Sequence, residues 1–159
     1  MKNSFRNEKL ELDAIDSKIL EHLDEHARIS IAEIAREVSM SSPSINERIK
    51  RMEEHGIITR YTVELDSESL GYPLVAIVRM RQHPGKIKEL IAMIQSIPEI
   101  IECDKVTGED CFITRICFES MSQLDTILDK LSGLSETNTS IVKATVVKRR
   151  NVPYHFRRS

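Results

Sequence analysis

Apolar residues recur every three or four positions in three segments near the N-terminus, which predicts three amphipathic helices. Asp13 can cap the first helix, which is expected to run to about Arg28. The second helix begins after Ser30, and Glu33 three residues later completes a capping box. The N-terminal part of the chain is therefore expected to be helical, with an apolar stripe on each helix.

The third predicted helix carries the pattern around which the chain is organised. Ser42 is its expected cap, Pro43 fits the first helical position, and Gly56 supplies the stop. Only three residues, 39–41, connect it to the second helix. A short helix, a tight turn and a second helix, braced by a longer first helix, are typical of a trihelical helix-turn-helix unit that binds double-stranded DNA.

The polar faces of the third helix carry side chains that can reach phosphates and base edges in a major groove. The alternative is an ordinary amphipathic helix with a solvated polar face. Residues 1–66 hold ten Lys or Arg and fourteen Asp or Glu, so DNA affinity is expected from a local face rather than from net charge. The expected DNA contacts are Ser41, Ser42, Ser44, Asn46, Glu47, Arg48, Lys50, Arg51 and Arg60.

Residues 57–65 are β-branched and roughly alternating, which predicts a strand that acts as a wing or a link. The polar segment after it ends in Gly71 and Pro73 and indicates a domain boundary. We expect a DNA-binding domain with its linking strand at 1–66, a linker at 67–73, and a second domain at 74–159.

The second half repeats a strand-helix-strand pattern, which predicts a ferredoxin-like βαββαβ domain and an α+β protein. The helices are expected on one face of an antiparallel sheet. Val75 and Ile77 point to the other face by parity, and Val142, Ala144 and Val146 are expected to join them. An uncovered apolar face predicts a homodimer with the sheets face to face. The expected strands are 74–82, 100–107, 112–118 and 139–150, and the expected helices are 84–97 and 122–134.

The composition describes a globular protein, with 40% hydrophobic and 30% charged residues among 159. No apolar run reaches the length of a membrane span, and the N-terminus lacks the apolar core of a signal peptide, so we expect a cytoplasmic protein without a membrane partner. The three cysteines form no C-x-x-C pair, which disfavours a disulfide framework or a structural zinc site. His22 and His26 have metal-ligand spacing but no third ligand, so neither a metal nor a cofactor is expected.

Several segments together resemble the leucine-responsive and asparagine-regulator (Lrp/AsnC, feast/famine) family of transcription factors. The resemblance covers nearly the whole chain. It is most specific in the N-terminal half and weaker in the C-terminal half. The segments that carry it are 12–20, 27–30, 34–38, 40–41, 48–58, 70–71, 106–108 and 139–142.

This resemblance implies a DNA-binding regulator that dimerises through its second domain and assembles dimers into octamers. It also implies that an amino acid or related metabolite binds between dimers, near the Gly108 turn and the start of the last strand. Turn N–H groups suit a carboxylate there, and a carboxylate or hydroxyl suits an ammonium. The family usually has an acidic residue at the position of Cys111. The implied effector residues are Thr107, Gly108, Glu109, Asp110, Cys111, Thr137 and Thr139.

Two other functions remain open. One is a nucleoid-associated protein that wraps DNA without an effector, helped by the basic tail at 148–158. The other is a small metabolite-binding enzyme with a thiolate pair of Cys111 and His83. The sequence contains no nucleophile elbow, phosphate loop or zinc signature, so we expect no enzyme.

Overall fold

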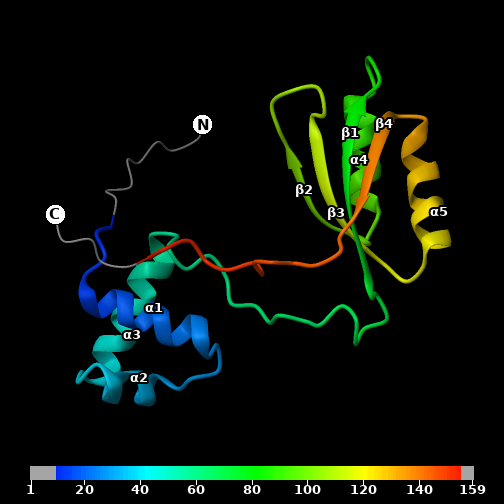
Figure 1. Cartoon of the computed structure of the whole chain (residues 1–159). Helices are drawn as coiled ribbons and strands as arrows, with labels where there is room; N and C mark the ends of the chain where they lie inside the picture. Colours follow the sequence, from blue (N-terminus) through cyan, green and yellow to red (C-terminus); the bar gives the residue numbers. More distant parts are fainter. Residues whose placement is uncertain (1–9, 155–159) are drawn as a thin grey trace. The chain divides into compact units, whose positions relative to one another are not determined.

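The computed structural model describes residues 10–154 and divides the chain into two compact units (Figure 1). Among the described residues, the N-terminal unit comprises residues 10–64 together with residues 149–154. The C-terminal unit comprises Leu65–Lys148. The predicted second domain runs to residue 159, whereas the described chain after Lys148 belongs to the N-terminal unit. Residues 155–158 of the basic tail lie outside the described residues.

The N-terminal unit is built from three helices, α1 (Ala14–Glu25), α2 (Ile31–Glu37) and α3 (Ser42–Glu54). Their inner stripes meet in one small core, as the helical periodicity predicts. Its buried residues are Ile19, Ile34, Ala35, Ile45, Ile49 and Met52.

Side-chain caps define where these helices begin. Asp13 and the Ser30–Glu33 pair cap α1 and α2 as expected. The cap of α3 is Ser41 rather than Ser42, since the Ser41 hydroxyl accepts the Ser44 N–H at 3.3 Å. Helix α1 ends at Glu25, three residues earlier than expected.

The turn between α2 and α3 depends on a left-handed residue. Ser39 has φ 55°, a conformation more usual for glycine. The next N–H, that of Met40, donates to the Ala35 carbonyl at 2.8 Å and closes the end of α2. This local geometry sets the direction in which α3 leaves the turn.

The strand expected at 57–65 is wrong. The N–H groups of Ile57 and Ile58 donate to the Met52 carbonyl, and both side chains pack on the helical core. From Thr59 to Asp66 the described backbone is exposed and joins no sheet. An extended segment needs a partner strand to satisfy its ladder of hydrogen bonds, and neither described unit provides one.

The C-terminal unit has the expected βαββαβ order and an antiparallel sheet with strand order β2-β3-β1-β4 (Figure 1). Helices α4 and α5 supply buried residues to one core with β1 and β3. The strands are β1 (Leu74–Gln82), β2 (Ile100–Lys105), β3 (Phe112–Phe118) and β4 (Ser135–Ile141), and the helices are α4 (Ile87–Ser96) and α5 (Met121–Ser132).

Strand β4 begins four residues earlier and ends nine residues earlier than expected. It pairs with β1 from Ser135 opposite Gln82 to Ile141 opposite Ala76. The Val142 N–H still reaches the Val75 carbonyl, at 2.8 Å, but β1 itself begins at Leu74. The residues after Val142 therefore have no strand left to pair with, and Ala144 and Val146 do not extend the sheet.

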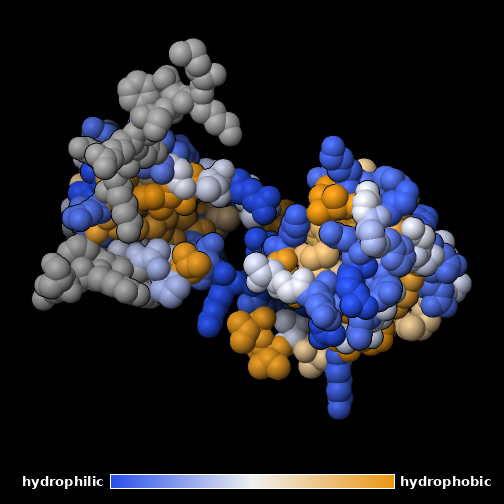
Figure 2. Space-filling view, turned by 90° about the horizontal axis from the view of Figure 1, so that it is seen from above, coloured by the Kyte–Doolittle hydropathy of each residue, from blue (hydrophilic) through white to orange (hydrophobic). Residues whose placement is uncertain are grey.

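The sheet face away from α4 and α5 mixes apolar and charged residues. The pairing places Val75 beside Cys117 and Ile77 beside Arg115, on the opposite face from Ala76 and Val78. In the view of Figure 2, hydrophobic residues of this unit form patches among hydrophilic ones. Among the described residues no helix is both long and apolar enough to cross a membrane.

Candidate DNA-binding face and effector loop

Two arginines of α3 hold the helix against the beginning of α1. Arg48 Nη1 lies 2.7 Å from Asp13 Oδ2 and 2.7 Å from Asp16 Oδ1, and Arg51 Nη2 lies 2.9 Å from Asp16 Oδ2. Asp16 is fully buried, and the Arg48 side chain is only 22% exposed. A buried carboxylate is tolerated when charged donors surround it, so these ion pairs fix the rotation of α3 on α1.

Arg48 and Arg51 are two of the expected DNA contacts, and the structure gives both of them partners within the same chain. Both guanidinium groups point to carboxylates of the same chain. The sequence showed two basic residues on a polar flank but not the buried partner, because Asp16 lies 32 residues from Arg48. The Nε atom of Arg51 is buried without a hydrogen-bond partner, which further marks this side of α3 as interior.

The ion pairs also shift the ionisation of the residues involved. Burial by itself would raise the pKa of Asp13, but the Asp16 N–H and the Arg48 guanidinium together lower that pKa below its usual 3.8. The same contacts with Asp13 and then Asp16 raise the pKa of Arg48. Asp13 and Arg48 are therefore both charged near neutral pH.

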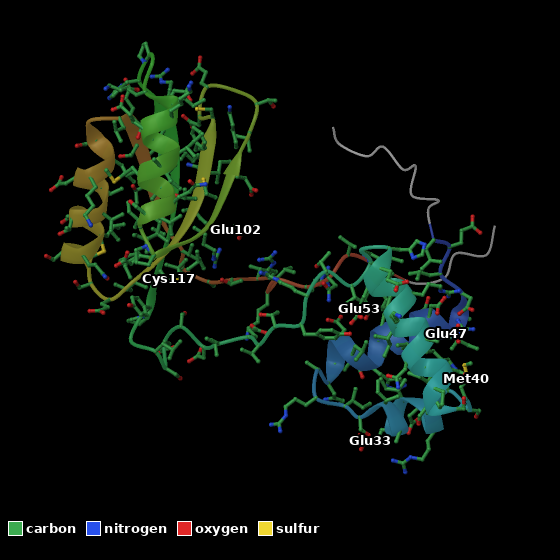
Figure 3. The ribbon with its side chains drawn as sticks, turned by 180° about the vertical axis from the view of Figure 1, so that it is seen from behind. Glu33, Met40, Glu47, Glu53, Glu102 and Cys117 are labelled. Atoms are coloured by element: carbon green, nitrogen blue, oxygen red, sulfur yellow. The ribbon has the colours of Figure 1, made fainter. Side chains whose placement is uncertain are left out.

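The outward face of α3 is formed by the remaining polar side chains. Asn46, Glu47 and Lys50 are exposed, and Glu47 is labelled in Figure 3. Lys50 Nζ lies 3.7 Å from Glu54, its i+4 neighbour. This face is rich in hydrogen-bonding groups but has little net positive charge.

The start of α3 and its surroundings supply further polar groups. Ser41 is exposed, Ser42 and Ser44 are half-buried, and the Ser41 and Ser44 hydroxyls lie 2.8 Å apart. Arg60, which follows the helix, is exposed. Arg36 on α2 is also exposed and was not among the expected contacts. It is the single basic residue of this short helix, so the sequence gave no signal that it belongs with the basic residues of α3.

A shallow groove of about 510 Å³ lies beside this face, between α3 and the connection from α1 to α2. Asn46, Lys50 and Glu53 line its polar side. The Tyr61 hydroxyl donates to Glu53 at 2.8 Å, and burial and this bond raise the pKa of Tyr61 to about 12. This hydrogen bond holds Tyr61, which follows α3 in the chain, against the helix.

The expected effector residues gather at one end of the sheet of the C-terminal unit. Gly108 has φ 116° in the turn between β2 and β3, and the Glu109 side chain is 88% exposed. Arg81 connects this turn to β4, since its guanidinium lies 3.6 Å from Glu109 and 2.6 Å from Glu136. Arg81 and Glu136 were not expected from the sequence, because their pairing depends on the register of β1 and β4.

The other expected effector residues do not all face this cluster. The Cys111 thiol lies 3.1 Å from the Gln82 side-chain oxygen, and Thr107 and Asp110 are exposed in the turn. Thr137 and Thr139 pair with Met80 and Val78, so they share the helix-covered side of the sheet at its edge. Glu136 and Asn138 lie on the side of Arg81. The described residues contain no group of three or more potential metal ligands.

A trihelical helix-turn-helix unit joined to a second, ferredoxin-like domain is typical of DNA-binding transcriptional regulators. Two families match the chain. The winged helix-turn-helix DNA-binding family covers residues 12–59, and the Lrp/AsnC ligand binding domain covers residues 75–152. The chain belongs to the Lrp/AsnC family of transcriptional regulators, and it is not an enzyme.

Similar proteins span nearly the whole chain. The transcriptional regulator LrpC of Bacillus subtilis is 32% identical over 84% of this chain and 92% of its own length. The leucine-responsive regulatory protein of Haemophilus influenzae is 35% identical over 85% of this chain and 86% of its own length.

Solved structures agree with this relationship. The structure of B. subtilis LrpC has a TM-score of 0.83 at 31% identity and covers 88% of this chain and 100% of that one. A transcriptional regulator of Neisseria meningitidis in complex with L-methionine has a TM-score of 0.83 at 26% identity and covers 89% of this chain and 96% of that one.

The ion pairs predict that Arg48→Ala destabilises the N-terminal unit. Asp16 would keep only Arg51 as a charged partner, so we expect a loss of about 2–4 kcal/mol in the free energy of unfolding. Urea denaturation of the full chain, followed by circular dichroism, measures this loss. Lys50→Ala is the matched control and is expected to change stability by less than about 0.5 kcal/mol. Equal stability of the two variants would show that the cluster does not hold α3 in place.

Proposed function

We propose that this chain binds specific DNA sequences through the outward face of α3. Asn46 and Glu47 offer an amide and a carboxylate to base edges, and amide side chains pair well with adenine while carboxylates accept from cytosine. The serines at the start of α3 and the exposed Arg36 and Arg60 suit phosphate contacts. The observation that carries the proposal is the ion-pair cluster, which turns this polar face outward.

Base recognition predicts a marked effect of Asn46→Ala. We expect a loss of about 1–3 kcal/mol in affinity for the preferred fragment and relaxed preference at one position, because the variant removes a bidentate partner. Lys50→Ala is expected to weaken binding to all fragments and to lower the salt slope by about 1. Fluorescence anisotropy with promoter fragments at several salt concentrations measures both effects.

The matched control is Lys130→Ala, since Lys130 is exposed on α5 of the other unit. It is expected to bind like the unchanged protein. If the unchanged protein binds every fragment equally, the chain wraps DNA without sequence preference. If Asn46→Ala binds like Lys130→Ala, the reading face is misassigned.

We further propose a homodimer through the uncovered sheet face. Ile77 and Ile113 lie on this face, which has no covering element within the described C-terminal unit. A groove of about 330 Å³ adjoins β2 and β3, and the exposed Leu70 and Ile101 line it together with Cys117. Glu102 and Cys117, on neighbouring strands, are labelled in Figure 3. Two copies joined here would present two reading helices to two half-sites, and assembly of four such dimers would give an octamer.

This dimer predicts that Ile77→Asp dissociates the protein into monomers. A carboxylate placed on the shared face would lose its hydration when the two sheets meet, so we expect dimer affinity to fall at least about tenfold. Analytical ultracentrifugation over a concentration series measures it. Lys88→Asp, on the exposed side of α4, is the control. A dimer of unchanged affinity in Ile77→Asp would place the interface elsewhere.

The effector is proposed to be an amino acid or a related metabolite that modulates assembly or DNA binding. The methionine complex of the Neisseria relative supports this class of ligand. In this chain Arg81 suits a ligand carboxylate, and Glu109 and Glu136 suit its ammonium. Contact with Arg81 lowers the pKa of Glu136, so its carboxylate is charged at neutral pH. The turn around Gly108 adds backbone N–H groups.

The proposal predicts stabilisation by at least one of the twenty amino acids. A ligand at 100 times its Kd adds about 2.7 kcal/mol to the stability of the folded state, which shows as a higher Tm. Thermal-shift measurements on the full chain test this, and Arg81→Ala is expected to abolish the response while Lys130→Ala keeps it. A flat response to all twenty would argue for a regulator without an amino-acid effector.

A further inference from the structure

The chain passes between its two units twice. It leaves the N-terminal unit after Glu64 and returns to it at Arg149, so the C-terminal unit is an insertion within the N-terminal one. The returning segment, residues 149–154, belongs to the compact N-terminal unit although it lies more than 90 residues beyond α3 in the sequence. Such a long-range return needs specific contacts, because closing the loop costs conformational entropy.

Hydrogen bonds attach this segment to α1. Asn151 Nδ2 donates to Asp24 Oδ1 at 2.7 Å, and the Tyr154 hydroxyl donates to Asp24 Oδ2 at 3.1 Å. The Ser17 hydroxyl donates to the Tyr154 carbonyl at 3.2 Å. A single carboxylate thus receives two donors from the segment, and Ser17 lies two helical turns away on the same side of α1.

The electrostatics of the two partners are complementary. Glu21 and Glu25 lie on α1 on either side of Asp24, and the segment begins with Arg149 and Arg150. Burial, the bond to Asp24 and the charges of Asp24, Glu21 and Glu25 raise the pKa of Tyr154 to about 12. The tyrosine therefore remains a hydrogen-bond donor throughout the physiological pH range.

We propose that residues 149–154 form a latch whose docking surface is the Asp24 side of α1 in the same chain. The latch fastens both ends of the inserted C-terminal unit to the DNA-binding unit. A conformational change at the end of β4 is then transmitted to α1 through this segment as well as through the connection after α3. This last consequence depends on the proposed function, whereas the docking itself does not.

Limited trypsin digestion of the full chain tests the latch, because cleavage after Arg149 or Arg150 requires the segment to leave α1. Asp24→Ala removes the acceptor of two bonds and is expected to speed this cleavage about tenfold, as measured by mass spectrometry of the products. Tyr154→Phe removes one bond and is expected to have a smaller effect. Both positions are outside the helical core, so the variants are expected to fold, which circular dichroism checks.

Asp129→Ala, at an exposed acidic position on α5, is the matched control and is expected to leave the cleavage rate unchanged. Equal cleavage of the unchanged protein and Asp24→Ala would overturn the latch. Protection that disappears on dilution would also overturn it, because the segment would then dock on a second copy. Neither outcome depends on DNA or effector, so failure of the latch is distinguishable from failure of the proposed function.

Discussion

Asp16 of α1 is fully buried against α3, and its negative charge constrains how these two helices pack. An unpaired carboxylate there would be strongly destabilising, so Arg48 and Arg51 must turn inward to reach it. This constraint decides the rotation of α3, since Arg48 and Arg51 lie one turn apart on one side of the helix. Asn46, Glu47 and Lys50 are consequently left outward. The face that we propose binds DNA is thus oriented by the ion pairs of Arg48 and Arg51 with Asp16.

The polar residues of α3 therefore fall into two groups. Arg48 and Arg51 bind Asp16, whereas Asn46, Glu47 and Lys50 face outward. The outward face keeps few positive charges, and Lys50 lies close to Glu54. In the proposed function, sequence-independent attraction to phosphates is therefore weak in a single copy, and binding depends on hydrogen bonds to base edges and on two copies engaging two half-sites together. This favours a sequence-reading dimer over a protein that wraps DNA through charge.

Local signals in the sequence predicted much of the fold. Asp13 and the Ser30–Glu33 box fix helix starts through bonds within four residues, and β1 and β3 fall at their expected bounds because both are bordered by turns. The predictions that were wrong concern segments whose structure depends on pairing with residues distant in the sequence. The segment 57–65 has strand-like residues but no strand to pair with, and the end of β4 is set by where β1 begins.

The candidate sites also depend on contacts between residues that are distant in the sequence. The sequence placed the turn at Gly108 but not Arg81, whose importance arises from the register that brings Glu136 opposite it. It also grouped Arg48 and Arg51 with the DNA contacts, because a polar flank looks the same whether its partner is a phosphate or a buried Asp16. Only the fold distinguishes these two partners.

The most direct test of this account is an NMR titration of the full chain with its preferred DNA fragment, observing backbone amides and arginine side chains. We expect the largest shifts on residues 41–50, while the guanidinium signals of Arg48 and Arg51 stay unchanged because these groups remain bound to Asp13 and Asp16. Large DNA-dependent shifts of both guanidinium groups, with little change at Asn46 and Lys50, would contradict it.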